Sequence, residues 1–471
     1  MERSELILSE NREYKKPYGV CKRRYYSRQS PKHVQQLRKQ IDTSPNEFIP
    51  RLLSKSRELG LCLLDSCNAQ HPGSHKLIAG IDPIETFALA EVPDLGLARL
   101  DEILSGEKAA VFTLSYEFGS RLQGIGHTPS SGEPDIFVST FDALLVHDYR
   151  NGITAVHGNV DRIDNFHNVI NWNYQPESFS EPSREAVDSN FTKQRYLEAV
   201  EEIKERIRAG DTYQTNLTQQ LRYRLPDELS AAKVFTRLRN KHPAPFTALV
   251  ERPNSTVISA SPERFFRVVN NLIEASPIKG TRPRGREEHE DTKLFQELIA
   301  SEKDRAENTM IVDLLRNDLG HVCEYGTVEV TSLCELQTLP TVFHLVSTIQ
   351  GKLNNNTKPS EIIRALFPCG SITGAPKIST MRIINGLENM PRGLSMGAIG
   401  AYIPEKGFDG PGILDLSVAI RTMVIRDGVA TFNVGGGVTI ESDPEAEYAE
   451  SWSKAEALLD ALNANRPRET L

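Results

Sequence analysis

The sequence predicts an α+β fold, because strand pairs with tight turns alternate with separate helices along its C-terminal half. Two strand pairs are joined by turns at Asn254 and at Asn270–Asn271, residues that tolerate turn conformations. A third hairpin turns at Asp427–Gly428. Directly joined strands of this kind run antiparallel, which favours α+β over a doubly wound parallel sheet.

The elements follow one another in a regular order. Apolar residues at helical spacing predict a helix from Tyr196 to a stop at Gly210, and a second helix over 232–238. Ser442, Asp443 and Pro444 predict the start of a C-terminal helix. Strands are predicted at 247–250, 256–260, 265–269, 272–275, 413–425 and 429–434. The last strand is expected to end at the triple glycine Gly435, Gly436 and Gly437.

The overall charge excludes some functions. Sixty-three acids against 55 bases give the 471 residues a formal charge of −8, which argues against non-specific binding to nucleic acid or a membrane surface. No apolar run approaches the roughly 18 residues of a membrane span. The six cysteines form no close pairs, so we expect reduced thiols and a cytoplasmic location.

Loop-rich stretches divide the chain. Breaker residues at 174–190 predict a boundary, and a second polar loop is predicted at 354–360. We therefore expect an N-terminal tail or extension over 1–40, an N-terminal region over 41–190 and a motif-dense catalytic region over 191–465. Both regions are expected to share one intertwined fold.

Two pairs of acids are spaced for a common task. Asp304 and Glu307 lie in one predicted helix, and Glu447 and Glu450 lie in the C-terminal helix. A spacing of three places both carboxylates of each pair on one helix face. Facing each other across a cleft, the two pairs would hold Mg²⁺ through oxygen ligands. The residues alone leave open that both pairs are solvated surface charges.

A lysine in the segment 277–284 is unusually constrained. Lys279 lies between Pro277 and Gly280, close to the end of a predicted strand. Desolvation there would make its amine a nucleophile. The alternative is a solvated loop lysine. Glu263, on a neighbouring predicted loop, is either a general acid or a partner of Arg264.

Three further features indicate anion binding. The Gly-rich turn 370–377 runs into a predicted helix and offers backbone amides to an anion, although its spacing differs from a Walker A loop. Strand alternation places Arg421 on one face with Asp415, which indicates carboxylate binding or a structural ion pair between the two. Ser417 and Ala419 share that predicted face. His344 is either a polarising hydrogen-bond donor or a packed histidine.

These segments, in this order, resemble the chorismate-utilising enzymes, a family that includes synthases of anthranilate, aminodeoxychorismate, isochorismate and salicylate. The resemblance covers residues 195–463. The matching stretches are 210–217, Ser261-Pro262-Glu263-Arg264, 277–281, 307–320, 370–377, Ala419-Ile420-Arg421-Thr422 and 435–448.

The resemblance implies large antiparallel sheets packed face to face with helices on the outside. It implies Mg²⁺ held mainly by Glu307 and Glu450, with Asp304 and Glu447 supporting. Arg421 and the backbone of Gly435, Gly436 and Gly437 would grip the substrate's carboxylates. The other implied substrate-binding positions are Gln214, Thr281, His344, Thr373 and Lys377.

Two positions discriminate within the family. Members that activate water carry lysine at the position of Gln214, and an amide cannot serve as that base. At the position of Lys279, anthranilate-forming members carry alanine and aminodeoxychorismate-forming members carry lysine. The resemblance therefore implies that Lys279 adds covalently to chorismate while Glu263 acts as general acid. The expected product is 4-amino-4-deoxychorismate, in p-aminobenzoate and folate biosynthesis; anthranilate formation and a catalytically silent, tryptophan-binding regulatory role are the alternatives.

The N-terminal region resembles the same family less strongly, through 63–66, His71-Pro72 and Ile81-Asp82-Pro83. In relatives a related segment lines a tryptophan pocket, and Ser66 would contact that ligand. None of the six cysteines lies in the Gly-rich setting of a glutaminase nucleophile. We therefore expect a separate glutamine amidotransferase subunit to supply ammonia.

Overall fold

The computed structural model describes residues 37–467 except 70, 72–73, 90–91, 127–131, 176–182, 340–341, 407 and 409–411. The described residues form one compact unit. The expected tail over 1–40 lies outside the described residues except for its last four, which begin strand β1 (Leu37–Ile41). No helix in the described part of the chain is long and apolar enough to cross a membrane.

The first of two large sheets has twelve strands, and each of its recorded strand pairs is antiparallel. In spatial order it contains β1, β8 (Ile153–Gly158), β7 (Ala143–Asp148), β3 (Lys76–Gly80), β2 (Cys62–Asp65), β11 (Phe246–Arg252), β12 (Ser255–Ser261), β21 (Thr422–Arg426), β22 (Val429–Val438), β10 (Gln214–Arg224) and β18 (Gly374–Ala375), with β9 (Asp188–Ser189) paired to β10.

The second sheet has ten strands and is also antiparallel. In spatial order it contains β15 (Ile278–Pro283), β17 (Val342–Lys352), β14 (Leu272–Ser276), β13 (Arg264–Val269), β20 (Ile413–Val418), β19 (Ala398–Ile403), β5 (Ala109–Leu114), β6 (Ile136–Phe141) and β4 (Glu85–Leu89), with β16 (Glu329–Thr338) paired to β17.

The two sheets pack face to face through one apolar layer. Alternate residues of β2, β7 and β11 meet alternate residues of β5, β6 and β19 in this layer; Cys62, Val250, Val111 and Phe137 are examples. Because successive strand residues point to opposite faces, each sheet has a second apolar face that needs a cover. Helices supply that cover, as the family resemblance implied.

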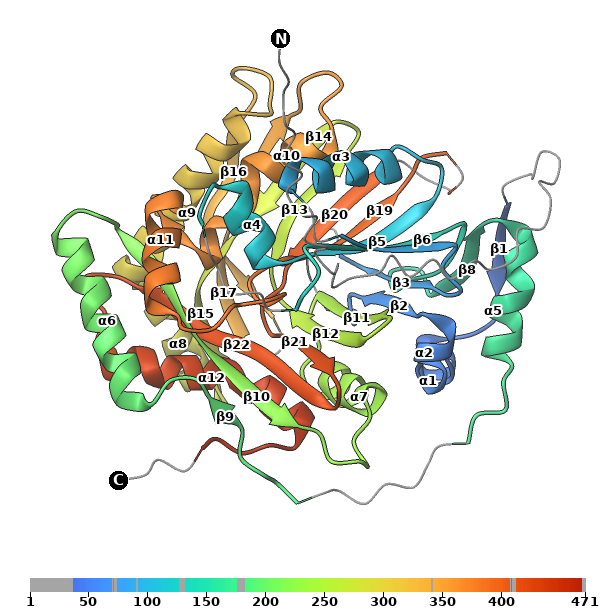
Figure 1. Cartoon of the computed structure of the whole chain (residues 1–471), viewed down its shortest axis with the longest axis horizontal. Helices are drawn as coiled ribbons and strands as arrows, with labels where there is room; N and C mark the ends of the chain where they lie inside the picture. The colour runs from blue at the N-terminus through green and yellow to red at the C-terminus, as the bar shows by residue number, and fades with distance from the viewer. Residues whose placement is uncertain are drawn as a thin grey trace, which may run out of the picture. The chain divides into compact units, whose positions relative to one another are not determined.

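Five helices pack against the outer face of the first sheet or beside it: α1 (Pro45–Ser54), α2 (Ser56–Leu59), α5 (Ile163–Ile170), α7 (Ala231–Lys241) and α12 (Pro444–Leu462). Four others belong to the apolar core of the second sheet: α3 (Pro93–Leu104), α4 (Tyr116–Leu122), α9 (Glu302–Gly320) and α10 (Pro359–Leu366). Helix α11 (Lys377–Leu387) packs against β10 and β18 of the first sheet. Figure 1 shows α7 below β12 and β21, with α3 and α10 on the opposite side above β19 and β20. The α+β prediction, with sheets face to face and helices outside, is confirmed.

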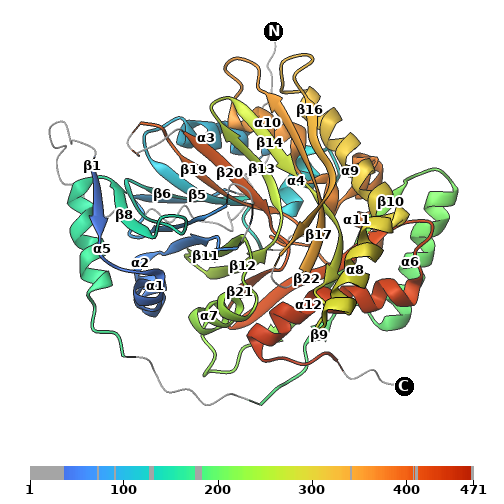
Figure 2. The ribbon, with the colours of Figure 1, turned by 180° about the vertical axis from the view of Figure 1, so that it is seen from behind.

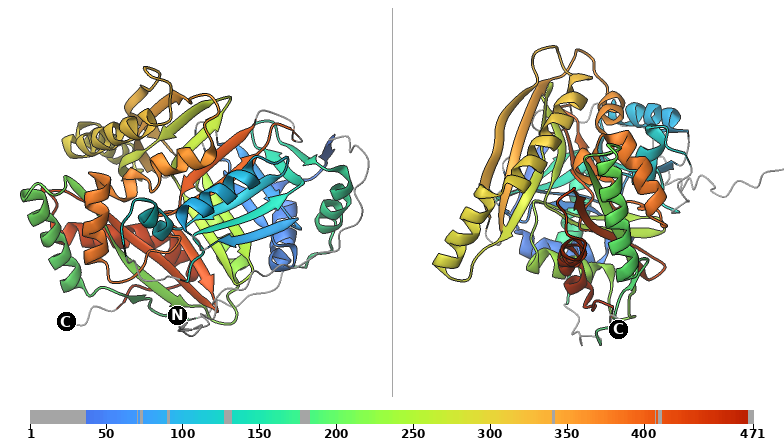
Figure 3. Two further views of the ribbon diagram at one scale, coloured as in Figure 1. Left: turned by 45° about the horizontal axis from the view of Figure 1, so that its top comes forward. Right: turned by 90° about the vertical axis from the view of Figure 1, so that its left-hand side faces the viewer.

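Two helices complete the surroundings of the C-terminal strands. Helix α6 (Lys193–Arg208) packs beside α12 and β10, as Figure 3 shows. Helix α8 (Glu288–Ala300) and α9 lie along β15 and β17, which is clearest from behind in Figure 2. Two short 3₁₀ turns, η1 (Val160–Arg162) and η2 (Gly370–Ile372), precede α5 and β18.

Both sheets combine N-terminal and C-terminal strands. In the first sheet β2 pairs with β11, and in the second β5 pairs with β19. Strands from before and after residue 190 therefore lie side by side in both sheets. The five cysteines within the described residues all carry free thiols.

Most predicted elements appear where the sequence placed them, but the region 413–438 differs. The predicted strand 413–425 is two strands, β20 and β21, which belong to different sheets. The prediction that the triple glycine ends its strand was also wrong, because β22 continues through all three glycines to Val438. The glycines pair with 216–218 of β10, so they are part of the first sheet.

Candidate active site

Two chain segments cross between the sheets side by side, and each carries a candidate residue. Pro262 and Glu263 connect β12 of the first sheet to β13 of the second. The segment 419–421 connects β20 of the second sheet to β21 of the first. Backbone hydrogen bonds hold the crossings together: Val418 N donates to Glu263 O at 3.1 Å, and Ala260 N donates to Arg421 O at 3.0 Å. The fold thus brings Glu263 and Arg421 into one region.

Arg421 lies at this crossing and not within a strand. Its φ of 49° is in the left-handed region, so the predicted face shared with Asp415, Ser417 and Ala419 was wrong. The prediction assumed that side chains alternate between two faces along one continuous strand. The chain leaves the second sheet after Val418 and enters the first sheet at Thr422, so this alternation does not extend to Arg421. Asp415 instead pairs with Arg264 at 3.1 Å and with Arg267 at 3.8 Å.

The Arg421 guanidinium is suited to an incoming anion. No recorded ion pair of the described residues joins it to a carboxylate, and burial lowers its pKa. A desolvated cation that lacks an acidic partner gains strongly from a carboxylate ligand.

Lys279 and Glu263 form the core of the candidate catalytic site. Lys279 lies in β15 and its Nζ donates to Ser371 O at 3.3 Å. Glu263 is buried, and burial raises its carboxyl pKa to about 7, although the Ser371 hydroxyl and the Lys279 charge oppose that rise. Glu263 Oε1 is buried without a hydrogen-bond partner. A carboxyl of this kind holds a proton near neutral pH and is able to deliver it.

The triple glycine forms a surface that other groups approach closely. A β-carbon at Gly435 would lie 1.8 Å from Leu217 O, so only glycine fits there. A β-carbon at Gly437 would lie 2.0 Å from Gln214 Nε2 and 3.5 Å from Lys279 Nζ. The glycine backbone therefore lies beside the candidate nucleophile and packs closely against Leu217 and Gln214.

Three of the predicted carboxylates gather next to these glycines. Glu307 Oε2 accepts from Gln214 Nε2 at 3.2 Å. On α12, a β-carbon at Gly436 would lie 3.2 Å from Glu447 Oε2 and 3.6 Å from Glu450 Oε1. Glu307 of α9 therefore contacts Gln214 of β10, while Glu447 and Glu450 of α12 border Gly436 of the neighbouring strand β22.

Burial and nearby lysines act in opposite directions on these acids. Burial raises the pKa of Glu307, and the charges of Lys279 and Lys303 limit the rise. Burial also acts to raise the pKa of Glu450, but Lys454 and the other lysines outweigh it and the net shift is downward. Glu450 is the more open of the two, with 51% of its side chain exposed.

The fourth predicted ligand lies differently. Asp304 pairs with Arg282 at 3.0 Å and is not hydrogen-bonded to the other three acids. A β-carbon added at Gly280 would lie 2.9 Å from the β-carbon of Asp304. Asp304 therefore borders β15, the strand that contains Lys279.

The chemistry of the donor set fits Mg²⁺. All donors are carboxylate oxygens, the hard ligands that Mg²⁺ prefers. Glu447 Oε1 accepts from Ser442 Oγ at 2.6 Å, whereas Glu447 Oε2 is buried and has no partner. Among the described residues no three acidic, His or Cys side chains are gathered tightly enough to hold one ion together. Two of these carboxylates pair with lysines: Glu447 with Lys303 at 3.6 Å and Glu450 with Lys454 at 2.7 Å.

His344 and Thr281 form a pair beside the crossing. His344 is buried in β17, and its Nδ1 is hydrogen-bonded to the Thr281 hydroxyl at 2.8 Å. Burial and the charge of Arg421 lower the His344 pKa to about 4. His344 is therefore neutral at pH 7 and able to donate or accept one hydrogen bond.

The remaining residues of the Gly-rich turn have partners within the protein. The Thr373 hydroxyl donates to Cys369 O at 3.0 Å. Lys377 Nζ donates to Asp318 Oδ2 at 2.7 Å and to Leu366 O at 2.9 Å. Lys377 therefore fastens the turn to α9 and α10, whereas Thr373 closes the turn on itself. Neither side chain has a recorded hydrogen bond to Lys279.

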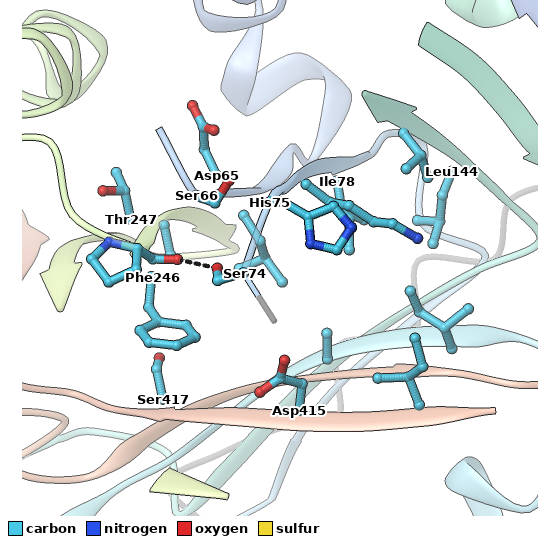
Figure 4. A pocket seen from close by; sticks show the side chains of 18 of the residues that line it. Asp65, Ser66, Ser74, His75, Ile78, Leu144, Phe246, Thr247, Asp415 and Ser417 are labelled. Atoms are coloured by element: carbon cyan, nitrogen blue, oxygen red, sulfur yellow. Dashed lines mark hydrogen bonds between the residues drawn. The ribbon is translucent and has the colours of Figure 1, made fainter. Parts of the chain in front are cut away.

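A separate cavity of about 190 Å³ lies between the sheets and includes Ser66. Figure 4 shows Ser66 and His75 on one side, with Asp415 and Ser417 across from them. Ser66 Oγ is buried without a hydrogen-bond partner. The predicted tryptophan-pocket residue therefore does line a cavity.

Sequence reasoning missed three residues of the site. Ser371 contacts both Lys279 and Glu263, and Lys303 and Lys454 lie among the carboxylates. Lys454 follows Glu450 by four residues, a helical spacing that the sequence shows. Ser371 acts partly through its backbone carbonyl, which no side-chain pattern reveals.

The fold and the site define an enzyme of the α+β class with a buried acid, a neighbouring amine, a carboxylate cluster and an unpaired arginine. A family model described as chorismate binding enzyme matches residues 62–460. The chain therefore belongs to the chorismate binding enzymes, the family that its motifs predicted.

Curated relatives fall in two groups. An aminodeoxychorismate synthase of Streptomyces pristinaespiralis is 45% identical over 269 residues, which are 57% of this chain and 36% of that protein. Anthranilate synthase component 1 of Bacillus subtilis is 39% identical over 287 residues, 61% of this chain and 54% of that protein. An anthranilate synthase component 1 of Haloarcula marismortui is 34% identical over 402 residues, which are 78% of this chain and 81% of that protein. The chain spans about a third to a half of the first two relatives.

Solved structures show the same fold. Anthranilate synthase component I from Streptococcus pneumoniae matches with a TM-score of 0.70 at 25% identity, covering 82% of this chain and 92% of that one. The menaquinone-specific isochorismate synthase of Escherichia coli matches with a TM-score of 0.70 at 15% identity, covering 93% and 96%. The second likeness concerns the fold alone.

Proposed function

We propose that this enzyme acts as an aminodeoxychorismate synthase component that converts chorismate and ammonia to 4-amino-4-deoxychorismate through a covalent bond to Lys279. The observation that best supports this proposal is the position of Lys279 Nζ. This atom lies beside the triple glycine of β22 and interacts electrostatically with Glu263 and Glu307. An amine at this place is next to both an acid and the candidate substrate site.

The first step uses Lys279 and Glu263 together. Solvent first takes one proton from the Lys279 ammonium group. The resulting amine forms a bond to ring carbon C2, the ring double bonds shift, and the bond between C4 and its hydroxyl breaks. Glu263 gives its proton to that hydroxyl, which leaves as water. The raised pKa of Glu263, about 7, keeps the proton available near neutral pH.

The second step reverses the bond to lysine. Ammonia bonds to C4, the double bonds shift back, and the bond from C2 to Lys279 breaks with release of the neutral amine. The proton lost by the new ammonium group returns to Glu263. Because lysine occupies C2 during the reaction, ammonia cannot be delivered there.

The substrate's charges need fixed partners. Arg421 would bind one carboxylate of the dianion, and the glycine strand would allow it to approach closely. Glu307 and Glu450 would hold Mg²⁺, with Asp304 and Glu447 supporting. When bound, Mg²⁺ supplies positive charge that neutralises a substrate carboxylate. His344 and Thr281 would offer neutral hydrogen bonds to the substrate, and Gln214 would fix Glu307.

Three further proposals concern ligands and location. A separate glutamine amidotransferase subunit would supply ammonia to the site, in the cytoplasm. Thr373 and Lys377 would contribute to substrate binding by holding the Gly-rich turn. The cavity at Ser66 would bind tryptophan, as the related segment does in the family.

Formation of anthranilate is the second candidate function. It is supported by the anthranilate synthase relatives, among them the one of which the chain covers 81%. In that reaction ammonia bonds to C2, the carbon that Lys279 would otherwise occupy.

Product identity separates the two. The full chain is incubated with chorismate, Mg²⁺ and ammonium, and the products are identified by mass and spectrum. Aminodeoxychorismate supports the proposal, and anthranilate as the main product of the unaltered chain contradicts it. Lys279→Ala should abolish aminodeoxychorismate, whereas the exposed control Lys352→Ala should not change it.

A further inference from the structure

The edge of β10 that faces away from β22 has two short partner strands. Strand β18 pairs with 214–215 and β9 pairs with 221–222. No recorded strand pair of the described residues fills the gap between them on that side. Asn216 and Thr218 lie in this gap and are buried, so their backbone polar groups need other hydrogen-bond partners.

A buried ion pair between Arg392 and Glu388 supplies these partners. Thr218 N and the Thr218 hydroxyl both donate to Glu388 Oε1, at 2.7 and 3.0 Å. The Arg392 guanidinium donates to Asn216 O at 2.7 Å. The two charged side chains are 2.7 Å apart and only 1% and 4% exposed. Because a buried ion pair is often no more stabilising than apolar side chains, its distinctive feature here is the set of backbone groups that it holds.

Arg392 also holds the Gly-rich turn. Its other terminal nitrogen donates to Ile372 O at 2.9 Å. The carbonyl of the preceding residue, Ser371, accepts from Lys279 Nζ at 3.3 Å. One guanidinium therefore joins the turn that contacts the candidate nucleophile to the backbone of β10.

The contact with β10 leads to the other side of the same amine. Asn216, whose carbonyl Arg392 binds, pairs with Gly437 across the ladder between β10 and β22. Gly437 is the glycine whose added β-carbon would lie 3.5 Å from Lys279 Nζ. The amine thus lies between the Gly-rich turn and the triple glycine of β22, and the ion pair links these two segments.

We propose that Arg392 and Glu388 are positioning residues for the Lys279 amine: their ion pair takes the place of a neighbouring strand along β10 and fixes the Gly-rich turn relative to the triple glycine. This inference rests on the proposed function for the chemical role of the amine. Arginine is required because its planar group donates to two carbonyls and a carboxylate at once. A lysine ammonium keeps the charge but cannot hold that geometry.

Hydrogen exchange of the full chain, measured by mass spectrometry, tests the structural half of the proposal without turnover. In Arg392→Lys, peptides that cover 214–220 and 370–376 should exchange about tenfold faster than in the unaltered chain, because both segments lose a fixed partner. Peptides from α7 should exchange at unaltered rates. Arg252→Lys is the matched control, since Arg252 forms an equally buried ion pair with Glu133, and it should leave 214–220 and 370–376 unaltered.

Steady-state kinetics of chorismate consumption test the functional half. Misplacing a reacting group by about 1 Å costs on the order of 100-fold in rate, so Arg392→Lys should lower kcat about 10- to 100-fold. KM should change by less than about threefold, because Arg421 and the other proposed substrate contacts are retained. Arg252→Lys should lower the unfolding temperature to a similar degree and leave kcat unchanged. A merely structural role of Arg392 would give the same result in both variants.

Glu388→Gln carries the test if Arg392→Lys does not fold. It keeps an acceptor for Thr218 N but removes the charge that Arg392 binds. Exchange of 370–376 should again be faster, and kcat should fall by about threefold or more at similar KM.

Two results would overturn the proposal. One is unaltered exchange of both segments in the folded variant, and the other is a kcat no lower than that of Arg252→Lys. Identification of anthranilate as the product would contradict the proposed function, whereas exchange and kcat for chorismate consumption would still measure what the ion pair does. The two proposals therefore fail separately.

Discussion

Gln214 Nε2 donates a hydrogen bond to Glu307 Oε2 at 3.2 Å, and the Gln214 side chain lies against Gly437. The position that distinguishes amine from water chemistry in the family thus contacts a candidate metal ligand directly. Gln214 Oε1 is buried without a hydrogen-bond partner. An amide here holds Glu307 but cannot remove a proton from water.

Substitution at Gln214 tests this relationship. Gln214→Lys places an amine beside Glu307, so we expect aminodeoxychorismate formation to fall at least tenfold and a water adduct of chorismate to appear. Chromatography of the products with and without ammonium measures both. Gln214→Leu removes the hydrogen bond without adding a base, and a water adduct in that control would show that the lysine is not responsible.

Glu263 is expected to control the pH dependence of activity. Its pKa of about 7 means that the acid form is lost as pH rises through neutrality, so kcat should fall above about pH 7. Glu263→Gln should lower kcat by about 10²- to 10⁴-fold, with KM changed little. Steady-state kinetics from pH 5.5 to 8.5 provide the measurement, and a variant that keeps the unaltered profile would exclude Glu263 as the acid.

The same carboxyl makes a prediction for stability. Its pKa is raised above the ordinary 4.5, so its contribution to stability is complete below about pH 4.5 and is lost as pH rises through about 7. Between pH 4.5 and 8, Glu263→Gln should gain on the order of 3 kcal/mol relative to the unaltered chain. Denaturant unfolding at both pH values measures the difference, and equal pH dependence of the two proteins would contradict it.

Arg421 allows binding and backbone effects to be separated. Arg421→Gly relieves the strain of a left-handed backbone, so the free energy of unfolding should be unchanged or higher. The same substitution removes a charged hydrogen-bonding partner of the substrate, so KM for chorismate should rise about 100-fold. Arg421→Ala should show the same KM and lower stability than the glycine variant. Kinetics and thermal unfolding provide both readings; a glycine variant with unaltered KM would remove Arg421 from the substrate site.

Neighbouring glycines should respond differently to the same added methyl group. A β-carbon at Gly435 meets the backbone of Leu217, so Gly435→Ala should cost about 3 kcal/mol of unfolding free energy or more. At Gly436 the nearest atoms are movable ends of side chains at 3.2 Å or beyond, so Gly436→Ala should fold normally. It should nevertheless bind Mg²⁺ more weakly in calorimetry, since it crowds Glu447 and Glu450. Equal stability of both variants would refute the account of the strand.

Local sequence signals predicted much of this structure for identifiable reasons. The turn at Asn270–Asn271 adopts positive φ angles of 51° and 63°, which asparagine tolerates. Asp443 caps α12 by accepting from Ala446 N at 2.9 Å, and the following proline is at the helix start. Such features depend on neighbouring residues and so can be recognised in one sequence.

The two crossings between sheets could not be predicted in the same way. The segment 413–425 has the composition of one long strand, and nothing local shows that Arg421 leaves one sheet and enters another. The partners that decide this, 255–261 for β21 and 264–269 for β20, are about 150 residues away in sequence. The contact of Ser371 with Lys279 depends likewise on tertiary packing.

The covalent role of Lys279 is the central claim, and mass spectrometry of the intact chain tests it most directly. The protein is mixed with chorismate and Mg²⁺ without ammonia, quenched and digested. The account predicts that the peptide with Lys279 gains the mass of chorismate less one water, and that Lys279→Ala gains nothing. An unmodified Lys279 peptide, from protein that makes aminodeoxychorismate once ammonium is added, would contradict it.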